Sequence, residues 1–187
     1  MRRGVIRPLL QTAAVAFVAL TARASVADHY RVPTGSMEPT VQVGDRIVVN
    51  KAAYGLRIPF SERWLLRFST PARGEVVVLD PPQEEKSDNP TFVLLKRVVA
   101  TAGDLVEVRD GRVVIDGEPT DVSPNLELGG GPDFGPIRVP TGKVLVLGDN
   151  RGNSRDGRTF GFIDREQVLG RAFAVVGRDG KPAFEKL

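Results

Sequence analysis

The sequence predicts a mainly β fold. Short segments rich in Val and Ile recur along the chain, and each is bounded by Gly, Pro or Asp, which is typical of strands joined by turns. The expected strands are 46–49, 75–79, 92–99, 105–108, 112–115, 144–147 and 171–176. No long helical period follows the N-terminal stretch. A chain of 187 residues, of which 41% are hydrophobic, fits one globular domain.

The clearest local signal is a hairpin over 107–114. Asp110-Gly111 suits the two positive-φ positions of a type I′ turn. The stretch 117–143 contains Gly129-Gly130-Gly131-Pro132 and predicts an irregular excursion, while the polar stretch 81–90 predicts an exposed loop.

The positive charge is confined to the N-terminus. The net charge is +3, and Arg2, Arg3 and Arg7 lie in a first heptad without acids, so residues 8–187 carry 26 − 3 = 23 basic and 23 acidic side chains. A nucleic-acid face would need clustered positive charge on the folded part. A basic tail before an apolar run is instead a membrane orientation signal, so no nucleic-acid partner is expected.

The uncharged stretch 8–22 has two interpretations. As a helix it would reach roughly 22 Å, which is short of the ~30 Å hydrocarbon core, although flanking Arg side chains can snorkel. The same stretch fits the apolar region of a cleaved signal peptide, with 22–24 or 25–27 as cleavage sites. In either case the domain leaves the cytosol and the N-terminus stays inside.

Two scarce residue types limit the chemistry. The chain has no Cys, which excludes thiol nucleophiles, disulfides and thiolate metal sites. It has one His, so a zinc site built on several His is excluded and a Ser-His-Asp mechanism would have to use His29. Acid–base work at neutral pH therefore falls to a carboxylate or a Lys.

Ser36 lies in a tight turn between two prolines, in the run 33–40. Gly35 frees the backbone beside Ser36, and Pro39 stops any helix from continuing. Such a turn can present both a hydroxyl and its own N–H to a carbonyl, as a nucleophile with an oxyanion hole requires. The alternative is an ordinary solvated turn.

Lys96 and Arg97 interrupt the apolar strand 92–99. Alternation places them on opposite faces, so one of the two should be buried if one face of the sheet is covered. Lowering the pKa of a Lys from about 10.4 to about 8 by burial costs roughly 3 kcal/mol and yields a base for a Ser hydroxyl. The alternative is a pair that snorkels from an edge strand.

The run 148–158 follows an expected strand and is dense in donors and acceptors. Asp156 and Arg158 could form an ion pair, and Ser154 could bond a buried amine. A surface turn cluster or a calcium loop are the alternatives, but Asp149, Asn153 and Asp156 do not have EF-hand spacing.

Together these segments resemble bacterial type I signal peptidases, which are membrane-bound serine proteases. Four blocks follow one another in family order across roughly residues 30–175: Ser36-Met37 with Pro39-Thr40; Gly44-Asp45 with 49–51 and 54–60; Lys96-Arg97-Val98 with Gly103-Asp104; and 148–151 with Asn153-Ser154, Asp156, Arg158 and Gly161.

The resemblance implies a fold of antiparallel sheets with a partly closed, barrel-like catalytic core behind one transmembrane helix. It also implies a Ser/Lys dyad of Ser36 and Lys96 that cuts exported preproteins through an acyl-enzyme, without cofactor or metal. The Thr34 hydroxyl and the Ser36 N–H would form the oxyanion hole. The remaining site residues would be Ser154, which orients Lys96; Gly148, Asp149, Asn150, Asp156 and Arg158, which support the last block; and Met37, Leu94 and Leu95, which line pockets for an Ala-X-Ala site.

The resemblance further implies that the N-terminal segment is kept as an anchor. Residues 1–7 would be a cytoplasmic tail, 8–27 a single transmembrane helix, and 28–187 the catalytic domain on the periplasmic side of a bacterial inner membrane. The lipid bilayer is then a partner. An apolar rim that dips into it would consist of Trp64, Leu65, Leu66 and Phe68, unless these residues pack in the core.

The chain departs from the family pattern in several places. Thr34 stands where many relatives have Ser and keeps the hydroxyl, while Gly157 replaces a common Ser beside Asp156. The excursion 117–143 is shorter than the second β domain of larger relatives, and one apolar segment precedes the domain where some relatives have two.

These departures permit a specialised peptidase with one dedicated substrate, of the conjugation or pilin type. An inactive, membrane-tethered peptide-binding module is a third possibility. Related self-cleaving repressors carry a DNA-binding domain, for which residues 1–30 leave no room.

Overall fold

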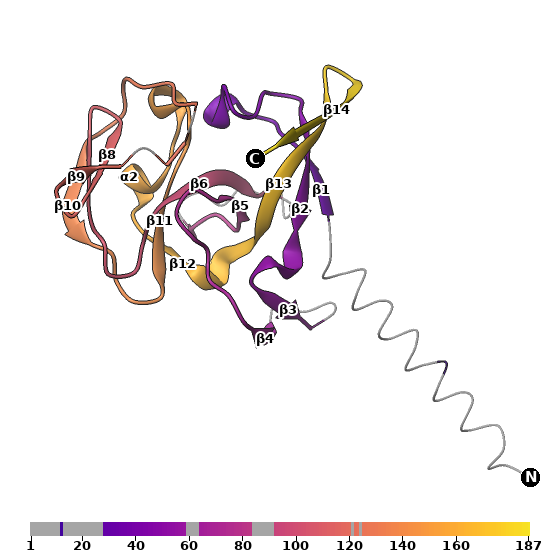
Figure 1. Cartoon of the computed structure of the whole chain (residues 1–187), viewed down its shortest axis with the longest axis horizontal. Helices are drawn as coiled ribbons and strands as arrows, with labels where there is room; N and C mark the ends of the chain where they lie inside the picture. Colours follow the sequence, from indigo (N-terminus) through magenta and orange to yellow (C-terminus); the bar gives the residue numbers. More distant parts are fainter. Residues whose placement is uncertain (1–11, 13–27, 59–63, 84–91, 121, 124) are drawn as a thin grey trace, which may run out of the picture.

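A computed structural model of the chain describes Thr12 and residues 28–58, 64–83, 92–120, 122–123 and 125–187. These residues form a mainly β fold of antiparallel sheets, as expected (Figure 1). The expected tail and anchor at 1–27 lie, apart from Thr12, outside the described residues. Within the described part of the chain, none of the helices has the length and apolar character needed to span a bilayer.

The largest sheet has eight strands in the order β1-β2-β13-β5-β6-β11-β12, with β14 paired to β13, and it curls around the centre of the domain (Figure 1). Its strands are β1 (Asp28–Arg31), β2 (Arg46–Asn50), β5 (Val76–Leu79), β6 (Leu94–Thr101), β11 (Lys143–Leu147), β12 (Ile163–Asp164), β13 (Val168–Arg178) and β14 (Lys181–Lys186). β13 pairs with β2, β5 and β14, so it joins strands from the early and the late parts of the described chain.

A second sheet has the order β10-β7-β8-β9 and covers one end of the first (Figure 1). Its strands are β7 (Leu105–Arg109), β8 (Arg112–Ile115), β9 (Glu118–Pro119) and β10 (Phe134–Arg138). The predicted hairpin is confirmed, with φ of 48° at Asp110 and 77° at Gly111. The excursion 117–143 is less irregular than expected, because it contains the strand β10. The Gly135-Pro136 pair within β10 is typical of a turn, but hydrogen bonds to β7 hold the segment as a strand.

The expected strands are found as β2, β5, β6, β7, β8, β11 and β13, with ends shifted by a few residues. β6 begins at Leu94 rather than at residue 92, and β13 is eleven residues long. Among the strands that the sequence pattern missed, β1 and β14 are short and rich in charged residues. The short helical elements are η1 (Gly35–Met37), η2 (Lys51–Ala53), η4 (Arg151–Asn153), α2 (Gly157–Phe160) and η5 (Arg165–Gln167).

The core consists of three clusters built mainly from Val, Ile and Leu. One cluster joins Met37 of η1 to Ile47, Val78 and Val175 of the large sheet. A second fills the space between the two sheets, and a third, around Tyr54 and Val77, covers the other face of the large sheet. Since β5 and β6 have clusters on both faces, side chains on either face of these strands are removed from water.

A two-stranded sheet of β3 (Gly55–Arg57) and β4 (Trp64–Arg67) projects from the body (Figure 1). Trp64 packs against the third cluster, and the Arg67 guanidinium lies 4.7 Å from its ring centre. By contrast, Leu65, Leu66 and Phe68 are 63%, 57% and 61% exposed. The predicted rim is therefore divided: Trp64 faces the core, and its three neighbours face solvent.

Candidate active site

Ser36 is presented by the short helix η1. Thr34 precedes it in extended conformation, with φ −133° and ψ 154°, and Glu38 ends it with an N–H bond of 3.1 Å to Gly35 O. Met37 is fully buried and anchors the turn, while Ser36 is half-buried beside it. The Glu38 carboxylate folds over Gly35, 2.7 Å from where a Cβ would lie, but it is the end of a flexible side chain, so this contact alone does not require glycine at 35.

Lys96 reaches Ser36 from the middle of the large sheet. Its Nζ donates a hydrogen bond of 2.7 Å to Ser36 Oγ. The Lys96 side chain comes from β6, and the residue is only 3% exposed. His29, by contrast, is exposed on β1 opposite Val48. The structure thus brings together the two residues that the sequence selected as nucleophile and base.

Both Lys96 and Arg97 are buried, at 3% and 4% exposure, because both faces of the sheet are covered rather than the one face that the expectation assumed. β6 lies between β5 and β11 rather than at an edge, and each of its faces is covered. Lys96 points toward η1, whereas Arg97 donates to both carboxylate oxygens of Asp149, at 2.9 and 2.6 Å. The alternative of a snorkelling edge pair therefore does not hold.

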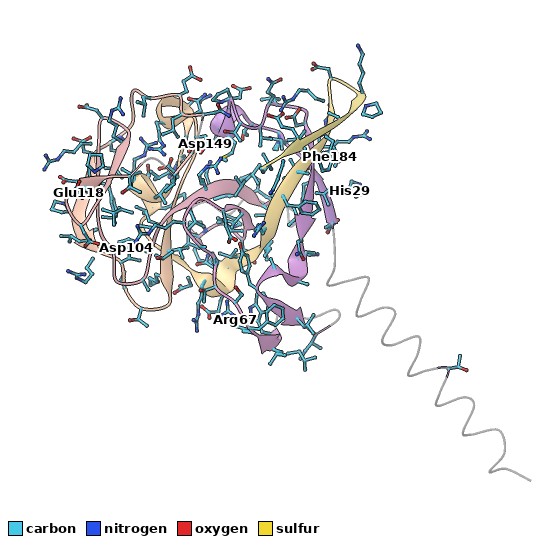
Figure 2. All side chains as sticks on the ribbon, in the orientation of Figure 1. His29, Arg67, Asp104, Glu118, Asp149 and Phe184 are labelled. Carbon is cyan, nitrogen blue, oxygen red and sulfur yellow. The ribbon has the colours of Figure 1, made fainter. Side chains whose placement is uncertain are left out.

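Asp149 collects hydrogen bonds from distant parts of the chain. Besides Arg97, Thr40 Oγ1 donates to its Oδ2 at 2.6 Å and Ser123 Oγ at 3.2 Å. Figure 2 labels Asp149 near the centre of the domain. A fully buried carboxylate needs such donors. The local sequence does not indicate that Thr40 and Ser123, which lie 109 and 26 positions away, bond to Asp149.

The last block also contacts the nucleophile through its backbone. Asn150 N donates to Ser36 O at 3.1 Å, and the Asn150 side chain accepts from Asn153 N at 3.2 Å. Gly148 lies so close to Ser36 O and Ser154 Oγ that a Cβ would collide with both. Glycine is therefore required at 148 by close approach rather than by backbone angle.

Asp156 and Arg158 form the predicted ion pair. Their side chains are fully buried and joined by two bonds, of 2.9 and 3.0 Å. Asp156 also caps α2 by accepting from Arg158 N, and it accepts from Gly148 N at 3.0 Å. Gly157 is tightly packed, since a Cβ would lie 2.6 Å from Leu145 Cδ1 and 2.9 Å from Val146 O. The Ser expected from the family pattern would not fit here without movement.

Ser154 is placed differently from the expected arrangement. Its Oγ is buried and finds no hydrogen-bond partner among the described residues, so the bond expected to orient Lys96 is not formed. The hydroxyl lies against Gly148, next to the Ser36 backbone. An orienting role for Ser154 stays a prediction.

A groove of about 260 Å³ opens beside Ser36 and Lys96. It runs between β1 with the segment that follows it and the start of β6. The expected pocket residues Met37, Leu94 and Leu95 line it. The sequence interpretation missed the remaining lining residues: Tyr30, Arg31, Val32, Pro33, Ile47, Val78, Phe92 and Val93. Alternation along β1 and β2 could have indicated Tyr30, Val32 and Ile47, which point to one face.

The groove suits an extended, largely apolar ligand. Most of its lining is apolar, and its charged residues are Arg31 and Lys96, with no carboxylate among them. Thr34 also lines the groove, and its hydroxyl makes no capping bond to η1. Across the described residues, no group of three or more His, Asp or Glu side chains is placed to hold a metal ion.

The family model for signal peptidase, peptidase S26, matches residues 5–177 of this chain. The chain belongs to this family. It is 38% identical over 156 residues to probable signal peptidase I-2 of Synechocystis sp., covering 83% of this chain and 66% of that protein. Signal peptidase I of Leptolyngbya laminosa is 36% identical over 83% of this chain and 71% of its own length. Membership confirms the resemblance and the expected class of serine peptidase.

Relatives also occur outside bacteria. Thylakoidal processing peptidase 1 of Arabidopsis thaliana chloroplasts is 34% identical, over 87% of this chain and 46% of its own length. A crystal structure of a signal peptidase I from Enterococcus faecalis is 28% identical, covers 56% of this chain and 97% of that one, and superposes with a TM-score of 0.43.

Proposed function

We propose that this member of the peptidase S26 family is a membrane-bound endopeptidase that removes signal peptides from exported preproteins by a Ser/Lys dyad. The observation that carries the mechanism is the 2.7 Å contact between Lys96 Nζ and Ser36 Oγ. A hydroxyl is a weak nucleophile until a base within hydrogen-bond reach removes its proton. Lys96 meets this distance criterion for Ser36.

The reaction begins with Lys96 in its neutral form. Its nitrogen takes the proton of Ser36 as Oγ attacks the carbonyl carbon of the scissile peptide. The oxyanion of the tetrahedral intermediate is stabilised by the Ser36 N–H and the Thr34 hydroxyl. The C–N bond then breaks, and the protonated Lys96 gives its proton to the leaving amine. Water, activated by Lys96, hydrolyses the acyl-enzyme and regenerates Ser36.

The burial of Lys96 favours the neutral amine. A buried ammonium loses hydration, which disfavours the charged form. A substrate that fills the groove would exclude more water and strengthen the same effect.

The substrate would bind as an added strand. β1 ends the order of the large sheet, so one of its edges has no neighbouring strand among the described residues. An extended peptide can pair with such an edge. Met37, Leu94 and Leu95 would then form shallow pockets that accept the small side chains of an Ala-X-Ala site, the pattern expected of exported preproteins.

Residues 8–27 would anchor the enzyme in a bacterial inner membrane, with the basic tail inside and the catalytic domain on the periplasmic side. Signal peptides reach their peptidase in the bilayer, so an anchored groove meets them there. Leu65, Leu66 and Phe68 are exposed and would contact lipid.

Cleavage of an Ala-X-Ala preprotein tests the proposal. The wild type should release the mature protein, whereas Ser36→Ala should not, and the exposed Ser69→Ala should match the wild type. Cleavage by Ser36→Ala at the wild-type rate would exclude Ser36 as nucleophile. Cleavage of one dedicated precursor only would identify the specialised form of the enzyme.

A further inference from the structure

A second hollow lies on the large sheet. It has a volume of about 290 Å³ and is lined by three cations, three glycines and two apolar residues: Arg31, Arg46, Lys181, Gly44, Gly177, Gly180, Val176 and Pro182. These residues, called the basic hollow here, come from β1, β2, β13 and β14 and their connections. No carboxylate is among the lining residues.

The three cations of the basic hollow have no ion pair or side-chain hydrogen bond with any residue that the structure describes. The acids nearby are engaged elsewhere. Arg178 donates to Asp45 at 2.8 Å and also lies 2.9 Å from Glu185. The hydrogen bond to Asp45 is the main cause that raises the pKa of Arg178. Arg178 thus engages both acids, and neither of them forms an ion pair with Arg31, Arg46 or Lys181 among the described residues.

The register of the sheet concentrates this charge. Arg31 and Arg46 are directly opposite each other in the β1–β2 pair, and Gly177 is the partner of Arg46 on β13. Like charges in directly opposed positions destabilise a sheet. Gly177 has no side chain, so it contributes no group that could pair with Arg46. An anion seated between the two guanidinium groups would remove this repulsion.

We propose that the basic hollow binds a phosphate group. Guanidinium groups match phosphate oxygens with paired N–H donors, and an ammonium adds a point charge. Gly44 and Gly180 leave open space, because a Cβ at either position would meet nothing within 4 Å. These two positions therefore leave the hollow open to a tetrahedral anion.

The position of the hollow favours a phospholipid headgroup over free phosphate, an argument that rests on the proposed membrane anchor. Arg31 follows Asp28, the first residue after the anchor, by three positions, which span at most about 10 Å. Figure 2 labels Phe184 and His29 on the side of the domain where the chain enters β1. Phe184, on the same strand as Lys181, is 79% exposed. A headgroup in the hollow would hold this side of the domain against the bilayer.

The test is a titration of the full chain in nonionic detergent. The protein carries Ser36→Ala, so binding is read without cleavage and a failure of the proposed activity would not affect it. Inorganic phosphate and short-chain phosphatidylglycerol are added separately and followed by calorimetry. The hollow variant is Arg46→Gln with Lys181→Gln. The control removes the same charge from exposed positions of the second sheet, with Arg112→Gln and Arg138→Gln.

The wild type and the control should bind with equal affinity, and the hollow variant at least about tenfold more weakly, because it loses two charge-assisted contacts. Binding of phosphatidylglycerol supports a headgroup site. Binding of inorganic phosphate without binding of phosphatidylglycerol supports an anion site and rules out a phospholipid headgroup as its ligand. Equal affinity in the hollow variant and the wild type, or no binding to either, overturns the proposal.

Folding of the variant is checked by thermal unfolding. The midpoint should stay the same or rise, since Arg46→Gln removes a repulsive cross-strand pair. Should the double variant unfold, Lys181→Gln alone decides the question, because Lys181 is an exposed residue at the start of β14. Affinity equal to that of the wild type in this single variant would count against the site.

Discussion

Lys96 Nζ lies 2.7 Å from Ser36 Oγ, although 60 positions separate the two residues. One side chain comes from the middle of a buried strand and the other from a three-residue turn, and both open into the same groove. The contact depends on the packing of η1 against β6. Met37 stabilises this packing because its side chain is buried in the core beside the large sheet.

Replacement of Lys96 by Ala should lower kcat/KM for an Ala-X-Ala preprotein by about 10³-fold or more, because a general base contributes roughly 10²- to 10⁴-fold. Far-UV circular dichroism should be unchanged. The control is Lys143→Ala, which removes a half-exposed Lys that pairs with Asp164 on the same sheet. A Lys96→Ala enzyme with full activity would contradict the dyad.

The cleavage rate should rise with pH. Lys96 must lose its proton before it can accept the one from Ser36, and its burial disfavours the ammonium. We expect kcat/KM to rise at a lower pH than an exposed Lys, with its usual pKa of about 10.4, would require. Initial rates between pH 6 and pH 10 measure this. A profile that is flat, or that falls over this range, would exclude Lys96 as the base.

Arg158→Met should destabilise the fold strongly. It leaves the Asp156 carboxylate fully buried without its cation, and loss of one partner of such a pair costs about 3 to 5 kcal/mol. The exposed pair of Lys143 and Asp164 is the matched control, where Lys143→Met should cost about 1 kcal/mol or less. Urea unfolding distinguishes the two. Equal losses would mean that the buried pair contributes no more than a surface pair.

Tyr54 should make the protein sensitive to alkali. Burial, followed by its hydrogen bond of 2.8 Å to Glu75, raises the pKa of Tyr54 in the folded state. The contribution of Tyr54 to the free energy of unfolding is complete below its pKa in the unfolded chain, which is about 10. It is lost as the pH rises above that pKa, at about 1.4 kcal/mol per pH unit. Tyr54→Phe should remove this slope in the free energy of unfolding. If the Tyr54→Phe variant shows the same slope of unfolding free energy against pH, the slope is due to other titrating groups.

The sequence predicted most central strands because these are buried and rich in Val, so the signal is local. β1, β10 and β14 were missed since their hydrogen bonds come from neighbours, while their own sequences are polar or contain Gly-Pro. Edge strands of this kind owe their conformation to the partner strand.

The candidate site shows the same division. Ser36, Lys96 and the pair of Asp156 and Arg158 were found because each lies in a short, distinctive run of residues. The hydrogen bonds of Thr40 and Ser123 to Asp149 were not, since they join distant segments. The burial of both Lys96 and Arg97 followed from β6 being central to the sheet, which alternation along one strand does not reveal.

The exposed side chains of Leu65, Leu66 and Phe68 should bind lipid. Their replacement by Ser, in a chain lacking residues 1–25, should weaken binding to phospholipid vesicles by roughly tenfold for each apolar side chain removed. The control replaces Leu105, Leu128 and Ile137, which are 37%, 38% and 45% exposed away from β4, and should bind as before. Trp64 is left in place because it packs against the core. Cosedimentation measures the affinity, and equal binding by both variants would show that the β3–β4 sheet does not contact the bilayer.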